Sequence, residues 1–339
     1  MSVAPPVRPR RLMLALAAAL CALAPALPTT AQNPASGWGE LASMPIPRSE
    51  TAVAELDGKV YVLGGYPAGR IPSDVVQVYD VRTDTWGTTT PLPMPMHHTV
   101  AVSVDGTLYV IGGEFGGAGD GNPPVFLDTV FAYDPAKATW EPRAPMPRGA
   151  SAGGAGVIDG KIYVAGGRPP AGHDFRVYDP RADTWTVLPD LPTQRNHVAV
   201  GAIDGKVYVA GGRFGPGFNS ELTDILEIYD PATNAWTTGP PMPSGVRSGM
   251  ASIVVNNCLY AIGGEWDRAV PSGVFPQNEA YDAARGTWRV LEPMVTPVHG
   301  LTGAALANGR ILIPGGSLTN GVSEVSTKLQ TFRADLDCR

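Results

Sequence analysis

The residues of this sequence that could do chemistry are arginines, histidines and glutamates that recur at matching points along the chain. One series lies a fixed distance before each Asp-Gly turn or its equivalent: Arg48, Met96, Ala150, Arg195, Arg247 and His299, with Arg148 slightly upstream in the third case. A second series follows each diglycine: Tyr66, Glu114, Arg168, Arg213, Glu265 and Ser317. Because a guanidinium grips a carboxylate in a fork, the two series favour an anionic ligand such as an acidic sugar or an acidic peptide.

Aromatic residues follow the second series and add stacking area. They are Phe115, Phe214, Phe218 and Trp266, and Trp266 is the one tryptophan outside the repeated position described below. The expected ligand-binding set is Arg48, His98, Glu114, Arg168, Arg195, His197, Arg213, Arg247, Glu265, Trp266 and His299. The alternative for any single arginine is a structural role, in which it packs or caps a loop.

Metal binding is the next chemistry to weigh. His98, His197 and His299 fall on alternate repeats, and three imidazoles with an open fourth position could hold zinc or copper. No spacing signature supports such a site, so we expect no metal and no cofactor.

The elements that must position these residues are short strands in a repeat. An apolar strand ending in two glycines occurs six times, roughly 50 residues apart, which is the period of a repeat architecture. The six pairs are Gly64-Gly65, Gly112-Gly113, Gly166-Gly167, Gly211-Gly212, Gly263-Gly264 and Gly315-Gly316. Such a period outranks any local pattern as evidence for the fold.

Each repeat carries the same further marks. A Tyr-Asp pair follows the glycines, beginning at Tyr79, Tyr133, Tyr178, Tyr229 and Tyr281. A tryptophan follows each pair, at Trp86, Trp140, Trp185, Trp236 and Trp288. A turn rich in proline and methionine, a strand of small residues and an Asp-Gly or Asn-Gly hairpin complete the unit. This order predicts four strands, a to d, in each repeat, stacked as sheets around an axis.

The pattern resembles the kelch repeat from Trp38 to about Phe332, and the resemblance implies an all-β fold, a six-bladed kelch-type β-propeller with four antiparallel strands per blade. The last repeat departs from it, with Thr331-Phe332-Arg333 where Tyr-Asp should be and no tryptophan after it. Trp38 precedes Gly64 by the same offset that separates Trp86 from Gly112. We therefore expect an N-terminal strand around Trp38 to close the ring as strand d of the last blade.

The resemblance also extends to exported six-bladed kelch proteins that include a sialic-acid mutarotase. That chemistry needs an acid or base near an arginine that holds the sugar carboxylate. Glu50, Glu114 or Glu265, with Arg195 or Arg247, would be the candidates. Galactose oxidase, built on a kelch propeller, implies a copper-radical site with a Tyr–Cys crosslink and two histidines.

Cys258 and Cys338, the two cysteines outside residues 1–31, argue against a copper-radical site. Cys258 begins a strand on the face away from the histidines, at a position where other repeats have Lys59 or Lys206, and we expect it to be exposed. Cys338 lies a few residues beyond the last strand. A Cys258–Cys338 disulfide would hold the C-terminal tail beside the ring closure, and the alternative is two free thiols.

Residues 1–31 have the pattern of an export signal, and residues 32–339 would form the propeller. Arg8, Arg10 and Arg11 precede an apolar run that is too short to span a bilayer. The formal net charge is −6, and removal of these three arginines would bring it to about −9. An acidic chain is a poor candidate for binding nucleic acid. We expect an exported, periplasmic or extracellular monomer without a membrane anchor.

The function that these observations favour is binding without catalysis. The partner would be a protein or a carbohydrate, held on the face that carries the b–c and d–a loops, called the long-loop face below. The alternative is a cofactor-free sugar epimerase or mutarotase acting on an acidic sugar.

Overall fold

The computed structural model of this chain describes residues 1–4, 37–117, 121–217, 219–334 and 338. The chain divides into two units, Met1–Ala35 and Ser36–Arg339, and all described strands belong to the second. Most of the expected export signal lies outside the described residues, so it stays a prediction. Within the described part of the chain, no helix is long and apolar enough to cross a membrane.

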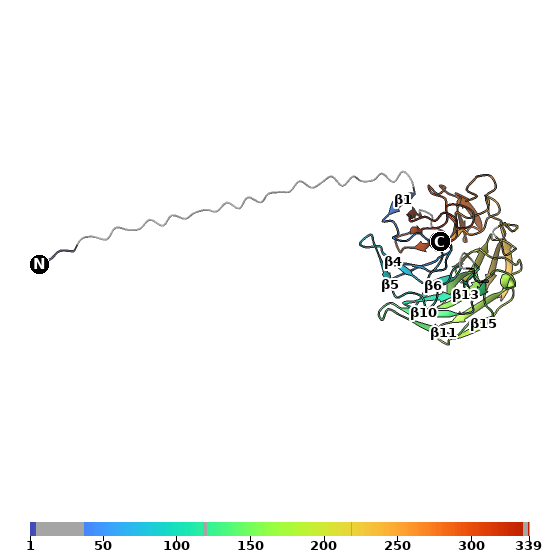
Figure 1. Ribbon diagram of the computed structural model, residues 1–339, viewed down its shortest axis with the longest axis horizontal. Helices are drawn as coiled ribbons and strands as arrows, with labels where there is room; N and C mark the ends of the chain where they lie inside the picture. The colour runs from blue at the N-terminus through green and yellow to red at the C-terminus, as the bar shows by residue number, and fades with distance from the viewer. Residues whose placement is uncertain (5–36, 118–120, 218, 335–337, 339) are drawn as a thin grey trace. The chain divides into compact units, whose positions relative to one another are not determined.

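Six four-stranded antiparallel sheets make up the second unit and confirm the predicted six-bladed propeller (Figure 1). Blade one consists of β2 (Ala52–Leu56), β3 (Lys59–Leu63), β4 (Val76–Asp80) and β5 (Thr85–Thr89). Blade two consists of β6 (Val100–Val104), β7 (Thr107–Ile111), β10 (Val130–Asp134) and β11 (Thr139–Arg143). Blade three consists of β12 (Gly154–Ile158), β13 (Lys161–Ala165), β14 (Phe175–Asp179) and β15 (Thr184–Val187).

The second half of the ring follows the same plan. Blade four consists of β16 (Ala199–Ile203), β17 (Lys206–Ala210), β18 (Leu226–Asp230) and β19 (Ala235–Gly239). Blade five consists of β20 (Ala251–Val255), β21 (Cys258–Ile262), β22 (Asn278–Asp282) and β23 (Thr287–Val290). Blade six consists of β24 (Ala304–Ala305), β25 (Arg310–Pro314), β26 (Leu329–Arg333) and β1 (Trp38–Leu41). Two smaller elements lie in b–c loops: the β8 (Glu114–Phe115) and β9 (Val125–Phe126) hairpin, and the 3-10 helix η1 (Ala171–His173).

The N-terminal strand β1 closes the ring, as the offset of Trp38 predicted. It pairs antiparallel with β26, with Trp38 opposite Phe332, and Figure 1 shows it beside the last strands of the chain. The same register places Trp86 opposite Tyr79 in blade one. Phe332 therefore takes the place of the repeated tyrosine, and the two ends of the chain share one blade.

The repeated tryptophans bind each blade to the one before it. Each indole Nε1 donates to a backbone carbonyl of the preceding blade: Trp38 to Glu292, Trp86 to Ala42, Trp140 to Thr90, Trp185 to Ala144, Trp236 to Pro189 and Trp288 to Pro240. Trp38 makes the same bond as the other five, so the closing blade joins its neighbour like every other pair. The indoles combine a large apolar area with one directed hydrogen bond.

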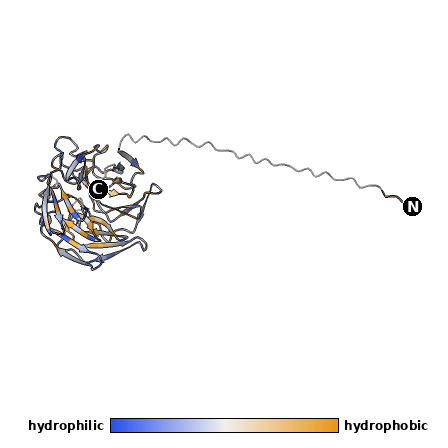
Figure 2. Cartoon of the chain, turned by 180° about the vertical axis from the view of Figure 1, so that it is seen from behind, coloured by the Kyte–Doolittle hydropathy of each residue, from blue (hydrophilic) through white to orange (hydrophobic). Residues whose placement is uncertain are grey.

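The diglycines allow neighbouring blades to approach closely. At the first pair, Gly64 has a φ of +60°, and a Cβ there would lie 2.3 Å from the carbonyl oxygen of Met96 in blade two. The N–H of Gly65 donates to that same carbonyl at 2.8 Å. Only glycine combines this backbone conformation with such a close approach. The buried apolar residues lie in the strands, and Figure 2 shows strand segments of high hydropathy within the blades.

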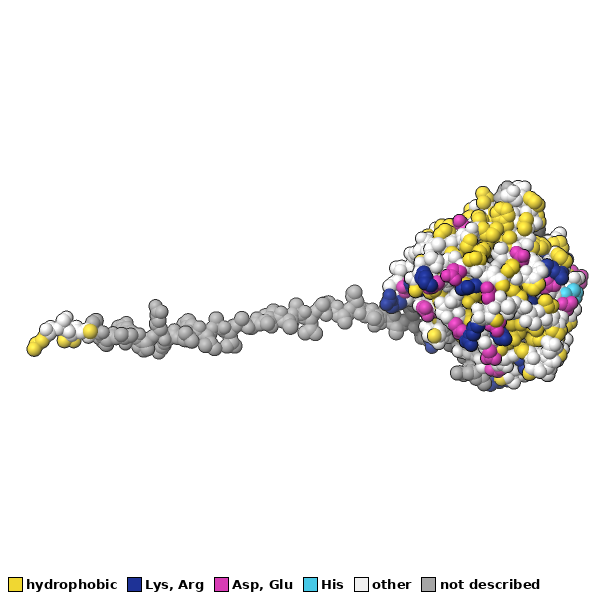
Figure 3. Space-filling view, turned by 90° about the horizontal axis from the view of Figure 1, so that it is seen from below, with side chains coloured by type: hydrophobic (Ala, Val, Ile, Leu, Met, Phe, Trp, Pro, Cys, Tyr) yellow, Lys and Arg dark blue, Asp and Glu magenta, His cyan; other side chains and the backbone are white. Residues whose placement is uncertain are grey.

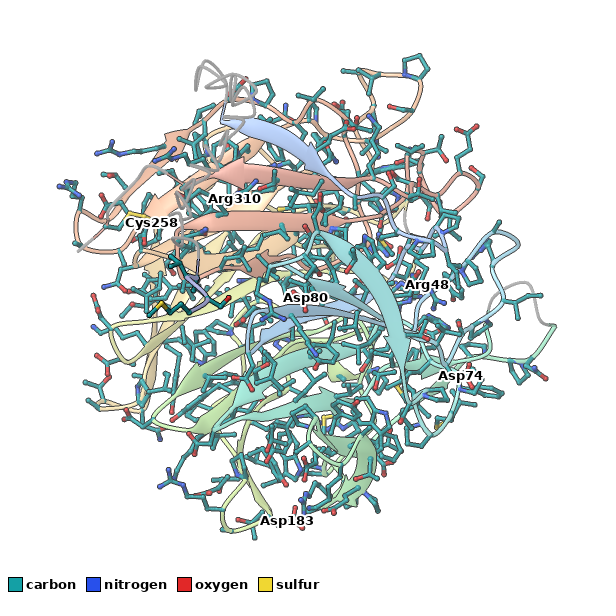
Figure 4. All side chains as sticks on the ribbon, turned by 90° about the vertical axis from the view of Figure 1, so that its left-hand side faces the viewer. Arg48, Asp74, Asp80, Asp183, Cys258 and Arg310 are labelled. Carbon is teal, nitrogen blue, oxygen red and sulfur yellow. A yellow bond between two sulfur atoms is a disulfide. The ribbon has the colours of Figure 1, made fainter. Side chains whose placement is uncertain are left out.

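Cys258 and Cys338 form a disulfide across 80 residues of sequence. Contrary to expectation, Cys258 is not exposed, because its side chain is fully buried in a cluster with Cys338 and Ala334 from the C-terminal tail. The Cys338 N–H also donates to the Asn256 carbonyl at 2.9 Å. Figure 4 shows Cys258 on the opposite side of the blades from Arg48, in agreement with the predicted separation of the two faces.

Candidate functional site

Six equivalent residues, one from each blade, form a closed ring of backbone hydrogen bonds around the axis. This axial ring consists of Glu50, His98, Ala152, His197, Gly249 and Gly300. Each N–H donates to the carbonyl of the ring residue one blade back, as from Ala152 to His98 at 2.9 Å and from His197 to Ala152 at 2.7 Å. The bond from Glu50 to Gly300 completes the cycle.

All six ring residues have the left-handed backbone conformation, with φ between 51° and 70°. Glycine adopts it freely, but Glu50, His98, Ala152 and His197 are held in it against their intrinsic preference. The sequence analysis named His98, His197 and Glu50 but missed the ring itself. The signal was a small or polar residue two positions after each member of the first series in blades one to five. In blade six the ring residue Gly300 directly follows His299.

One half of the polar cluster above the ring centres on His98. Its Nε2 lies 3.0 Å from Glu50 Oε2 and 3.1 Å from Arg168 Nη2. Glu114 lies beyond Arg168, with its Oε2 3.6 Å from Arg168 Nε, and accepts a hydrogen bond from Ser151 Oγ at 2.9 Å. A carboxylate, an imidazole and a guanidinium therefore converge at the axis from three neighbouring blades.

The other half centres on Arg213. Its Nη2 donates to His197 Nε2 at 2.8 Å, and its Nη1 forms an ion pair with Glu265. His299 Nδ1 lies 3.6 Å from the second oxygen of Glu265. The two halves meet where the rings of His98 and His197 pack edge to face, 5.1 Å apart. The structure thus brings together His98, Glu114, Arg168, His197, Arg213, Glu265 and His299, all from the predicted set.

Backbone carbonyls of the b–c loops cover this cluster, which we call the axial cluster. His97 Nε2 lies 2.9 Å from the Gly116 carbonyl, Arg168 Nη1 donates to Pro216 at 3.1 Å, and His299 Nε2 lies 2.8 Å from the Thr319 carbonyl. These loops come from blades two, four and six. Glu114, Arg213, Glu265 and His299 are consequently buried, whereas 19% of the Arg168 side chain remains exposed.

The electrostatics of the axial cluster favour a neutral imidazole at His97 and His197 and an ionised carboxylate at Glu50. Burial, and secondarily the nearby charge of His98, lowers the pKa of His97 to about 2. Burial and the adjacent Arg213 hold the pKa of His197 well below its ordinary value of 6.5. Burial by itself would raise the pKa of Glu50, but His98, His299 and Arg213 lower it below its usual range.

Metal binding at the axis meets a specific obstacle. Glu50, His98 and His197 bring one potential ligand atom each within 4.8 Å of one another. However, Nε2 of His197 already faces Arg213, and Nε2 of His98 faces Arg168. A metal ion would have to displace a guanidinium from these nitrogens, so the cluster is organised around arginine cations. The sulfur of Cys258 is bonded to Cys338, which removes it from any Tyr–Cys crosslink.

Three of the predicted ligand arginines lie in the interior. Arg48, Arg195 and Arg247 are fully buried, and each donates to backbone carbonyls inside its own blade. The expectation that these three arginines bind a ligand is therefore not supported, because the diglycine contacts place them between blades. His299 also differs from that series. The blade-six equivalent is Val298, whose carbonyl accepts from Gly264 as that of Arg48 accepts from Gly316.

Trp266 lies away from the axis, in a groove between the b–c loops of blades four and five. The groove has a volume of about 810 Å³, and Leu222, Val246 and Phe275 line it together with the indole. Trp266 has a φ of +76°, which is unusual for a bulky residue. Its backbone N–H donates to Asn320 Oδ1 at 2.8 Å, so the blade-six loop holds the backbone at this position.

Comparison with known protein families agrees with the six-bladed propeller fold. The family model "KLHDC2/KLHL20/DRC7 Kelch-repeats domain" matches residues 40–191, and the "Kelch motif" model matches residues 194–243 and 247–295. The chain belongs to the kelch-repeat family. The matches run through the blades and include the loops that carry Arg168, Arg213 and Trp266.

Relatives of this kelch propeller are similar over part of their length. Kelch-like protein terF of Aspergillus terreus is 36% identical over 119 residues, which is 35% of this chain and 25% of that protein. Kelch-like protein 35 of Mus musculus is 31% identical over 135 residues, 40% of this chain and 21% of that protein. The match therefore spans about a quarter or less of each relative.

A solved structure shows the same architecture over nearly the whole propeller. The structure of YjhT superimposes with a TM-score of 0.69 and 19% sequence identity, covering 85% of this chain and 95% of that chain. At this level of identity the likeness supports the propeller fold.

Proposed function

We propose that this kelch propeller is a binding module without catalysis, whose protein or carbohydrate ligand docks on the long-loop face. The observation that carries the proposal is the state of the axial cluster. Its carboxylates, Glu50, Glu114 and Glu265, are buried, and each has a cationic or hydrogen-bonding partner within the cluster. Carboxylates with such partners support the loops that cover them and do not form an open catalytic pocket.

Family membership supports the same proposal, because kelch propellers typically serve as protein-binding modules. Arg168 is the cation of the axial cluster with exposed surface, so an anionic group of the ligand would meet it first. Acidic and basic side chains are interspersed on the face seen in Figure 3. That face lacks the single-sign field that draws proteins to nucleic acid.

Export from the cytoplasm is part of the proposal. The Cys258–Cys338 disulfide supports it, since disulfides persist in oxidising compartments. Amino-terminal sequencing of protein recovered from the periplasm or the medium tests this step. Cleavage near Ala31 is expected, whereas an intact N-terminus in a cytoplasmic fraction would contradict it.

The experiment for the binding function is a thermal-shift screen of the propeller against acidic and neutral sugars and acidic peptides. A ligand that binds the native state raises the unfolding midpoint by mass action. Arg168→Ala should reduce the shift produced by an anionic ligand, whereas Arg181→Ala, on the opposite face, should not. A shift that survives Arg168→Ala but disappears in Arg181→Ala would refute docking on the long-loop face.

The second candidate is a sugar epimerase or mutarotase, favoured by the convergence of Glu50 and Arg168 on His98 at 3.0 and 3.1 Å. In that function Glu50 and His98 would transfer protons at the anomeric centre while Arg168 held the sugar carboxylate. Proton NMR exchange between the anomers of an acidic sugar measures it. Acceleration that Glu50→Gln abolishes would replace the binding proposal with this one.

A further inference from the structure

We propose that the groove beside Trp266 is a carbohydrate site that takes a neutral oligosaccharide, with the indole as its stacking surface. The inference rests on the proposed function, because the groove lies on the long-loop face, and it assigns one chemical class of ligand to this groove.

The shape of the groove fits a small ligand. Its volume of about 810 Å³ falls within the range of ligand pockets in proteins, roughly 300–1,000 Å³. Three separate loops enclose it: the b–c loops of blades four and five, and the d–a connection at Ser244–Val246. Val246 keeps 45% of its surface exposed at the rim, so the apolar wall is accessible from solvent.

The backbone that carries the indole is held in place by hydrogen bonds. The blade-six loop is bonded twice to the Trp266 loop, through Asn320 Oδ1 to the Trp266 N–H and through the Asn320 N–H to the Ser272 carbonyl, both at 2.8 Å. Asp267 N–H donates to Gly273 within the same loop at 2.9 Å. A bulky residue at a φ of +76° costs free energy, and such strain persists where surrounding contacts enforce it, often at binding sites.

The polar groups of the groove match paired hydroxyls. Asn219, Glu221 and Arg268 line the groove with a carboxamide, a carboxylate and a guanidinium, each of which presents two hydrogen-bonding atoms side by side. Two neighbouring hydroxyls on a pyranose ring offer the complementary pair. The apolar C–H face of the same ring can pack on Phe275 and on the part of the indole of Trp266 that Arg268 leaves uncovered.

The balance of one negative and one positive side chain in the groove favours a neutral ligand. Glu221 contributes one negative charge and Arg268 one positive charge, and Arg268 lies over the Trp266 ring at 5.5 Å. Because the two charges balance, a polyanion gains little here, and both groups are used as hydrogen-bonding partners. The arginine of the axial cluster, Arg168, remains the place for an anionic ligand.

The test is calorimetric titration of the propeller with maltotetraose, cellotetraose, chitotetraose, trigalacturonate and hexaglutamate. At least one neutral tetrasaccharide should bind, and Trp266→Gly should weaken it by about tenfold or more. Glycine accepts the φ at this position without strain, so the variant should keep the fold. Arg268→Gln should cause a smaller loss of affinity for the same tetrasaccharide. Ile71→Ala, an exposed apolar residue of the blade-one b–c loop, is the matched control and should bind like the wild type.

Failure of all three neutral tetrasaccharides to bind would overturn the inference, as would a tetrasaccharide affinity that Trp266→Gly leaves unchanged. Binding of trigalacturonate or hexaglutamate that is lost in Arg168→Ala but retained in Trp266→Gly, together with no binding of any neutral tetrasaccharide, would also overturn it. That last result would support the proposed binding function, so the two claims can fail separately.

Discussion

Arg195 and Glu227 form an ion pair within blade four, with Nη1 and Oε2 2.5 Å apart and almost no exposed surface on either side chain. Arg247 and Glu279 repeat the pair in blade five. Both arginines also donate to a backbone carbonyl at the end of strand b of the same blade. The pair therefore fastens the start of strand a to strand c in these blades and does not face a ligand.

Breaking the pair should strongly destabilise the propeller. Glu227→Gln leaves a buried guanidinium without its counter-charge, and the expected loss is about 3–5 kcal/mol in the free energy of unfolding. Urea denaturation measures it. Asp105→Asn, which breaks the exposed pair with Arg181 at 3.1 Å, is the control and should cost less than about 1 kcal/mol. Equal losses in the two variants would contradict the structural role assigned to Arg195.

Blade one has the same arginine without the carboxylate. Arg48 is fully buried with Nε and Nη2 unpartnered, Gln77 occupies the position of Glu227, and burial lowers the pKa of Arg48 to about 10. Gln77→Glu should place a carboxylate beside Arg48, closer than Asp74, and despite the loss of the hydrogen bond from Gln77 Nε2 to the Ile46 carbonyl it should stabilise the fold by about 1–3 kcal/mol. The midpoint and slope of urea unfolding report this change. A destabilised Gln77→Glu variant would show that the new carboxylate does not reach Arg48.

Acid should destabilise the propeller through the axial cluster. His97 and His197 are neutral in the folded state, whereas the unfolded chain takes up protons on them below pH 6.5, so protons favour unfolding. Glu50 acts in the same direction below pH 4.5, because its folded pKa is lowered. Each such histidine contributes about 1.4 kcal/mol per pH unit.

Urea denaturation at pH 8, 7, 6 and 5 measures this loss. His197→Gln should flatten the decline between pH 6.5 and 5, since the amide oxygen can accept from Arg213 without binding a proton. His173→Gln, at an exposed histidine, should leave the profile as it is. Stability that rises on acidification would contradict the buried neutral state of the histidines.

The axial ring predicts opposite effects at two equivalent positions. Ala152→Gly should stabilise slightly or be neutral, since glycine relieves the left-handed conformation at a φ of +58°. Gly300→Ala should cost about 1–2 kcal/mol or more, because its Cβ would also lie 2.6 Å from Glu50 Oε1. Thermal unfolding compares the two variants. The same sign and size for both would speak against a ring with these backbone angles.

Removal of the disulfide should loosen the ring closure. The bond spans 80 residues from blade five to the C-terminal tail, and the Cys258→Ala/Cys338→Ala variant should lose about 2–4 kcal/mol. Reduction of the wild type with dithiothreitol should give a similar loss and leave the double variant unchanged. A reductant effect on the double variant would point to a cause other than this bond.

Much of the fold could be predicted because the repeated sequence marks indicate the order of the strands in each blade. Trp38 identified the closing strand from its offset alone. The pairing of Trp38 with Phe332 was not predicted, because Phe332 breaks the Tyr-Asp pattern. The side-chain environment was harder to predict. Arg48 and Arg168 were both expected to bind a ligand, yet the diglycine contact buries the first between blades, whereas the second keeps part of its surface exposed.

Two further features depended on segments far apart in the chain. Cys258 occupies a position that is lysine in other repeats, so its burial could not be foreseen without the C-terminal tail that covers it. The axial ring depends on a backbone conformation that glycine marks in only two of its six members. His98 and His197 were selected for their chemistry, whereas their backbone geometry is what places them at the axis.

The most direct test of the proposed function is hydrogen–deuterium exchange of the propeller with and without the tightest ligand from the binding screens. The account predicts slower exchange in the b–c loops and d–a connections, above all in residues 168–174, 213–217 and 265–277, with no change in the a–b and c–d turns. Protection confined to those turns, or to the axial strands β2 and β6, would contradict docking on the long-loop face.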